Sequence, residues 1–141
     1  MWPVWRPDAV AVLQDKKAKM GLPRYFDVMQ DEKPAKFMIA KKLEASFIPE
    51  EPTEKLWTLH GKLTEDYYRL ENQIDAGQKS LHEIQTPERS YLDLKVEVAK
   101  RIIERCHLCT RRCGVNRLAG ELGLWCKAGA QITVSTIFEH M

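Results

Sequence analysis

Arg105-Cys-His-Leu-Cys-Thr-Arg-Arg-Cys-Gly-Val-Asn-Arg-Leu-Ala-Gly-Glu-Leu-Gly-Leu-Trp-Cys-Lys127 is the stretch around which this chain is organised. It holds all 4 cysteines of the 141-residue protein, with the spacing Cys-x2-Cys-x3-Cys-x12-Cys. Four converging thiolates are the ligand set of a structural zinc site or of an iron-sulfur cluster. We therefore predict one four-cysteine metal site. Its predicted ligands are Cys106, Cys109, Cys113 and Cys126.

The spacing is compatible with either kind of metal centre. A closed four-cysteine zinc site is structural, and it commonly pairs two Cys-x2-Cys units, of which only Cys106 and Cys109 form one here. A triplet of nearby cysteines with one distant partner, Cys126, suits the corners of a [4Fe-4S] cluster. Both cofactors, the [4Fe-4S] cluster and zinc, stay open on this reasoning.

The N-terminal sequence and the hydropathy of the chain predict a cytoplasmic protein. Residues 1–7 lack a basic start followed by an apolar segment, so they do not resemble a signal peptide. No stretch approaches the roughly 20 apolar residues that span a bilayer, so no membrane partner is expected. In a reducing compartment, clustered cysteines are metal ligands more often than disulfides.

Basic side chains gather near the cysteines. The whole chain has 22 basic and 20 acidic residues, a net charge of +2, which gives no general indication of nucleic-acid binding. Residues 100–127, however, carry seven basic and two acidic residues. We interpret Arg111, Arg112 and Arg117 first as compensation for thiolate charge, and only second as a surface for a phosphate-bearing partner.

Hydrophobic periodicity predicts a mainly α-helical fold. The clearest pattern runs over residues 53–74, where apolar residues recur at steps of three and four. Shorter helices are predicted over residues 8–19 and from Pro34 to about Phe47, and a further helix starts near Thr86. His60, beside the long stripe, is interpreted as a partly buried and hydrogen-bonded histidine rather than a metal ligand.

The helix that starts near Thr86 is predicted to lead into the metal site. Its inward stripe is predicted to consist of Leu92, Val96, Ala99, Ile103 and Cys106. Core packing would then fix the direction of the first cysteine, whereas the neighbouring His107 would point elsewhere.

Residues 130–138 are rich in β-branched residues and predict one strand after the cysteines. The expected fold class is mainly α: a helical N-terminal region, residues 1–86, followed by a small four-cysteine module that ends in a β-strand, residues 87–141.

Residues 88–141 also resemble a known family. The string Cys106-His-Leu-Cys-Thr-Arg-Arg-Cys-Gly-Val-Asn-Arg117, followed by Gly120-Glu-Leu-Gly-Leu-Trp-Cys126, is similar to the region before the catalytic barrel in radical S-adenosylmethionine (radical SAM) proteins related to pyruvate formate-lyase activating enzyme. Thr110 stands where the family often has proline, and Leu124-Trp125 adds one residue before the last cysteine. The Cys-x3-Cys-x2-Cys motif of the family's catalytic cluster is absent.

The resemblance implies an accessory N-terminal portion of a radical SAM enzyme that is not catalytic by itself. The partner it implies is a radical SAM barrel, in the same longer protein or in a separate chain, and S-adenosylmethionine would bind only with that barrel. Two alternatives accompany this expectation: a free-standing zinc module that binds a protein or nucleic acid, and one half of a split radical SAM enzyme.

Overall fold

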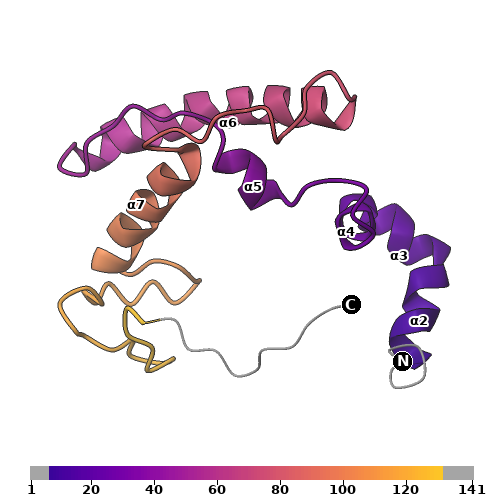
Figure 1. Cartoon of the computed structure of the whole chain (residues 1–141). Coiled ribbons are helices and arrows are strands. Elements are labelled where there is room, and N and C mark those ends of the chain that lie inside the picture. The colour runs from indigo at the N-terminus through magenta and orange to yellow at the C-terminus, as the bar shows by residue number, and fades with distance from the viewer. Residues whose placement is uncertain (1–6, 132–141) are drawn as a thin grey trace. The chain divides into compact units, whose positions relative to one another are not determined.

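The computed structural model describes residues 7–131, and these fall into two compact units, residues 7–35 and residues 36–131 (Figure 1). The regular secondary structure of the described chain is helical, which confirms the predicted mainly-α class. The predicted strand over residues 130–138 lies almost wholly outside the described residues. The predicted division at residue 86 stays a prediction.

The first unit consists of three short helices: α2 (Pro7–Gln14), α3 (Lys16–Gly21) and α4 (Pro23–Met29). The prediction of one helix over residues 8–19 is therefore wrong, because Asp15 interrupts it. The Asp15 carboxylate accepts hydrogen bonds from the backbone N–H groups of Lys17 and Ala18, at 2.7 and 3.2 Å. A side chain that caps free amides in this way starts a new helix.

The second unit packs α5 (Lys36–Ala40), α6 (Thr53–Asp75) and α7 (Tyr91–Glu104) against one another. The helix predicted from Pro34 to Phe47 is wrong in length, because it ends at Ala40. Beyond it the chain turns to an extended segment that pairs with the start of α7 in a β-bridge between Glu44 and Ser90. Backbone pairing across the molecule thus replaces the helical hydrogen bonds that a longer α5 would make.

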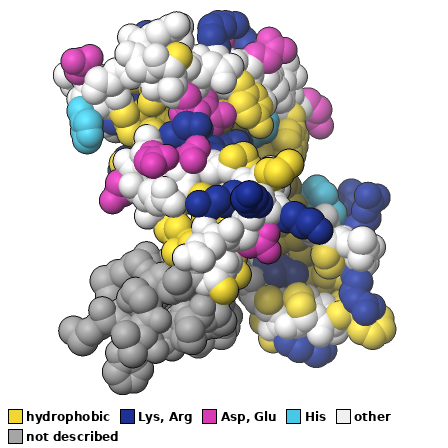
Figure 2. Space-filling model, turned by 90° about the vertical axis from the view of Figure 1, so that its right-hand side faces the viewer, with side chains coloured by type: hydrophobic (Ala, Val, Ile, Leu, Met, Phe, Trp, Pro, Cys, Tyr) yellow, Lys and Arg dark blue, Asp and Glu magenta, His cyan; other side chains and the backbone are white. Residues whose placement is uncertain are grey.

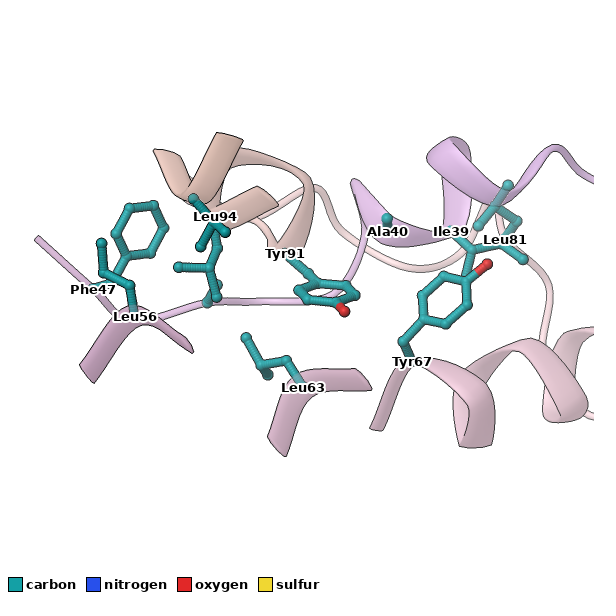
Figure 3. Close-up of a cluster of buried hydrophobic side chains, with 11 residues drawn as sticks. Ile39, Ala40, Phe47, Leu56, Leu63, Tyr67, Leu81, Tyr91 and Leu94 are labelled. Atoms are coloured by element: carbon teal, nitrogen blue, oxygen red, sulfur yellow. The ribbon is translucent and has the colours of Figure 1, made fainter. Parts of the chain in front are cut away.

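Helix α6 confirms the strongest sequence prediction and supplies one wall of the core (Figure 3). Its predicted stripe faces inward: Leu56, Leu63 and Tyr67 are buried, and Leu59, Leu70 and Ile74 pack against them. Apolar side chains from α5, α7 and the connecting segments complete the cluster: Ile39, Ala40, Ala45, Phe47, Leu81, Tyr91, Leu94 and Val98. None of the helices among the described residues is long and apolar enough to cross a membrane.

Helix α7 starts later than predicted and buries a different face. Its N-cap is Ser90, whose hydroxyl accepts from the Asp93 N–H while the Asp93 carboxylate accepts from the Ser90 N–H. The predicted inward stripe is wrong, since Val96 is 51% exposed. The neighbouring set is buried instead: Tyr91, Leu94 and Val98, with Ile102 partly buried.

The two candidate faces of α7 differ by one residue, a rotation of about 100° around the helix axis. Both are apolar, so periodicity alone could not choose between them. Cys106 follows Ile102 by one turn and is only 1% exposed, but it is not among the residues of the core cluster. That core packing fixes its direction stays a prediction.

Candidate metal centre

The cysteine loop, residues 105–131, leaves the C-terminal end of α7 and is fixed to it by backbone hydrogen bonds. The Arg117 N–H donates to the Ile103 carbonyl of the last helical turn, at 3.1 Å. Cys106 pairs with the returning chain, because its N–H donates to the Val115 carbonyl at 3.0 Å and its carbonyl accepts from the Gly114 N–H at 2.9 Å. The loop therefore has a defined path despite its lack of regular secondary structure.

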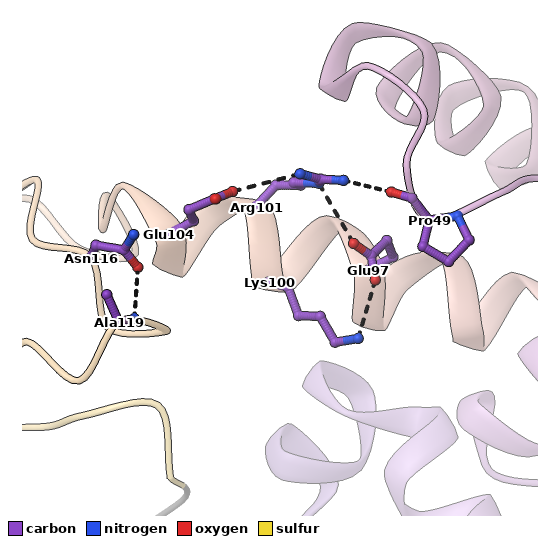
Figure 4. Close-up of polar contacts among 7 residues, drawn as sticks. All are labelled: Pro49, Glu97, Lys100, Arg101, Glu104, Asn116 and Ala119. Atoms are coloured by element: carbon purple, nitrogen blue, oxygen red, sulfur yellow. Dashed lines mark hydrogen bonds and ion pairs between the residues drawn. The ribbon is translucent and has the colours of Figure 1, made fainter.

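Side chains near the end of α7 connect it to the rest of the unit (Figure 4). The Arg101 guanidinium donates to the Pro49 carbonyl and lies 3.5 Å from the Glu97 carboxylate and 3.6 Å from that of Glu104. In the loop itself, the Ala119 N–H donates to the Asn116 side-chain oxygen at 3.1 Å. The helix end that carries the first cysteine is thus held to the segment before α6.

Two of the cysteines occupy turns of the same design. Each is followed by a residue in the left-handed region, Gly114 with φ of 70° after Cys113 and Lys127 with φ of 55° after Cys126. In both turns the backbone N–H two residues after the cysteine, from Val115 or Ala128, is near enough to the cysteine sulfur to lower its pKa. We call these two segments, residues 113–115 and 126–128, the thiol turns.

The thiol turns favour ionised sulfur. The Val115 N–H, with a further contribution from the Leu124 N–H, lowers the pKa of Cys113, and the Ala128 N–H lowers the pKa of Cys126. Hydrogen bonds to a charged form stabilise that form, and the thiolate is the form that binds metals. The backbone thus favours the thiolate form of both sulfurs.

Arg117 lies among the thiols. Its side chain is buried, its guanidinium donates to the Cys126 sulfur at 3.3 Å, and it also contacts the Cys106 thiol. Burial acts to lower the pKa of Arg117, but Cys106 and Cys126 outweigh it and the pKa is raised. The Arg117 Nε has no hydrogen-bond partner. A buried cation is therefore held beside sulfur with part of its donor capacity unused.

Three of the predicted ligands, Cys109, Cys113 and Cys126, line one pocket of about 350 Å³ together with Arg111, Arg117 and Trp125. Cys106 is buried and does not line the pocket, and its thiol contributes to the lowered pKa of Cys113. All four cysteines lie among the described residues, and each is a free thiol. No three Cys, His, Asp or Glu side chains of residues 7–131 converge in a geometry that would hold a single metal ion.

The residues beside the ligands divide into those that sequence reasoning placed correctly and those that it missed. His107 is exposed and its Nδ1 contacts the Arg105 carbonyl at 2.8 Å, away from the sulfurs as predicted. Arg111 stacks on the exposed ring of Trp125 at 4.3 Å, a cation-π pair. The amides of the thiol turns were missed. Gly114 was the only residue whose type indicated a thiol turn. Nothing in the sequence indicates that a lysine such as Lys127 adopts a left-handed conformation.

Comparison with known proteins gives one informative similarity. Over 98 residues, 70% of this chain, the sequence is 37% identical to "Uncharacterized protein MJ0674" of Methanocaldococcus jannaschii. The aligned region is 27% of that protein, so this chain spans about a quarter of the length of its relative. No family model matches the chain, and no solved structure matches it significantly.

Proposed function

We propose that the cysteine loop binds a [4Fe-4S] cluster through Cys106, Cys109, Cys113 and Cys126, and that the chain is an accessory N-terminal portion of a radical SAM protein. The observation that carries the proposal is the pair of thiol turns, which direct backbone N–H groups at two of the four sulfurs. Such donors around a thiolate are typical of metal sites, where outer contacts orient and tune the ligands.

The size of the pocket favours a cluster over zinc. A four-thiolate zinc site closes around a single ion, with Zn–S distances of about 2.3 Å. Here the three lining thiols border, with Arg111, Arg117 and Trp125, an open pocket of about 350 Å³. A multi-iron cluster is the larger of the two groups, and its corners can reach sulfurs that are further apart.

The charges around the site also fit a cluster with four thiolate ligands. Such a centre is net negative, and the guanidinium of the buried Arg117 would offset this charge while donating to the Cys126 sulfur. When bound, the cluster supplies a one-electron redox centre, and with four cysteine ligands it leaves no iron position free for S-adenosylmethionine. The loop would therefore support chemistry carried out elsewhere.

The partner of this module would be a radical SAM barrel, in the same longer protein or in a separate chain, and S-adenosylmethionine would bind there. The proposal includes a strand over residues 130–138 that leads from the module toward that barrel. The length of the relative supports this view, because its aligned region is only 27% of that protein.

Metal and sulfide content of anaerobically purified protein tests the proposal. We expect iron and acid-labile sulfide in equal amounts, with broad visible absorption from thiolate-iron charge transfer. Cys113→Ser and Cys126→Ser should each lose most of both, whereas His107→Ala, a neighbour that contacts only the Arg105 carbonyl, should retain them. A colourless protein that binds zinc would establish the zinc module instead, and a protein without metal would refute both.

A further inference from the structure

A second pocket, of about 340 Å³, lies on the helical core between α5, α6 and α7. Its walls include the rings of Phe37, Tyr67, Tyr68 and Tyr91, and the amino groups of Lys36 and Lys95 border it. Figure 3 shows Tyr67 and Tyr91 side by side, and their ring centroids are 5.9 Å apart. Pockets of this size, apolar with a few polar groups, are typical small-molecule sites.

The charge of this pocket is positive. No Asp or Glu side chain lines it, and its two lysines differ in their surroundings. The Lys36 amino group lies 3.8 Å from the Glu71 carboxylate, which offsets its charge. Lys95 has no carboxylate partner among the described residues. Its ammonium lies 4.3 Å above the centre of the Tyr91 ring and 3.1 Å from His60 Nε2.

His60 leaves the charge of Lys95 uncompensated rather than adding to it. An ammonium has only N–H donors, so in its contact with Lys95 the His60 Nε2 accepts and the ring is neutral, with its proton on Nδ1. The Tyr91 hydroxyl, 3.2 Å from the same Nε2, shares this acceptor. Burial and the nearby Lys95 charge both lower the pKa of His60, which keeps the ring neutral at physiological pH. One Lys95 N–H is used in this contact, and two remain for a ligand.

The geometry points to a binding site for a small monoanionic ligand with a flat apolar body, of the aromatic carboxylate class. The carboxylate would pair with Lys95, and the apolar body would lie against Phe37 and the tyrosine rings. One uncompensated ammonium matches one negative charge better than the two charges of a phosphate monoester. The site shares no residue with the cysteine loop, so it stands independently of the proposed cluster.

Titration of the intact protein with three matched probes tests this inference: benzoate, benzyl alcohol and benzylamine. We expect saturable binding of benzoate, with concentration-dependent shifts of the Tyr91 and His60 ring signals in NMR spectra. Because hydrogen bonds to charged groups are stronger than neutral ones, benzoate should bind about tenfold more tightly than benzyl alcohol. Benzylamine should not bind measurably.

Two variants distinguish the contribution of the Lys95 charge to ligand affinity from that of the apolar surface. Lys95→Met should reduce the affinity for benzoate to that for benzyl alcohol. Phe37→Ala should weaken both ligands by similar factors, and it should not disturb folding because Phe37 is 61% exposed. Lys62→Met removes an exposed α6 lysine outside the pocket, so it should leave both affinities unchanged.

Three results would overturn the inference. The first is the absence of saturable shifts with benzoate. The second is equal affinity of the unmodified protein for benzoate and benzyl alcohol. The third is an equal loss of benzoate binding in Lys62→Met and Lys95→Met, which would mean that the overall positive charge, rather than this pocket, attracts the anion.

Discussion

The helical core and the cysteine loop are stabilised in different ways. The core of residues 36–104 buries a continuous cluster of apolar side chains, with Ile39, Leu56 and Leu94 at 0% exposure. The cysteine loop buries little besides Cys106 and Arg117, and its large apolar residues are exposed: Leu108, Leu118, Leu122, Leu124 and Trp125. The core thus depends on apolar burial, whereas the loop depends on backbone hydrogen bonds, on its thiols and, by our proposal, on a metal centre.

The two regions also differ in charge, because residues 105–131 carry five basic residues and one acidic residue, whereas residues 36–104 carry 11 basic and 13 acidic residues. On the face in Figure 2, Lys and Arg side chains share the surface with acidic and hydrophobic side chains. We expect the contrast between core and loop to emerge in stability and in metal content.

The largest expected effect is that of Cys106→Ala. Structural metal binding contributes about 10 kcal/mol or more to the folding of small modules, so loss of a ligand should unfold the loop. Hydrogen exchange should show loss of protection in residues 105–131, with α6 still protected. The control is the unmodified protein without metal, because it keeps the packing of Cys106 and loses only the metal. Unchanged thermal stability in the variant would contradict the link between metal and loop.

The next effect is that of Leu94→Ala in the core. The side chain is 0% exposed, and truncation of such a leucine costs about 2–5 kcal/mol. Urea unfolding, monitored by circular dichroism, should show that the free energy of unfolding is lowered by this amount. Val96→Ala on the exposed side of α7 is the matched control and should cost much less. Similar losses in the two variants would mean that α7 buries the face first predicted from the sequence.

A smaller effect is expected in the thiol turns. Lys127 adopts a left-handed conformation that costs a residue with a side chain about 1–2 kcal/mol, so Lys127→Gly should stabilise the loop by roughly 1 kcal/mol. Gly114→Ala, at φ of 70°, should destabilise it by a similar amount. The measurement is the midpoint temperature of metal loss on heating. Opposite shifts in the two variants would confirm the left-handed conformations of both turns, and shifts of the same sign would contradict them.

The smallest effect concerns pH. The pKa of His60 is lowered in the folded protein by burial and by Lys95, so the unfolded chain binds a proton at higher pH than the folded chain does. The contribution of His60 to stability is complete above the unfolded pKa of about 6.5 and is lost as pH falls through the folded pKa. Urea midpoints at several pH values should decline over this range, and less steeply in His60→Gln.

The sequence predictions succeeded where one local pattern decides the structure and failed where tertiary contacts decide it. The span and inward face of α6 were predictable because one long amphipathic pattern decides them. The end of α5 and the face of α7 were not, because pairing with Ser90 and the choice between two apolar faces are tertiary effects. In the loop, the four-cysteine metal site stays a prediction, with three of the cysteines at one pocket. Nothing in the sequence predicted the left-handed Lys127 or the burial of Arg117.

The bridge between Glu44 and Ser90 has a consequence for the order of folding. It joins two segments that have all of α6 between them in the chain, so the entropy of closing this long loop must be overcome before α7 is anchored. Contacts of such sequence separation form slowly compared with a local helix. Because the cysteine loop begins at the far end of α7, we expect its path to become fixed only after this slow closure. A metal centre would therefore be acquired late, by a protein whose core is already folded.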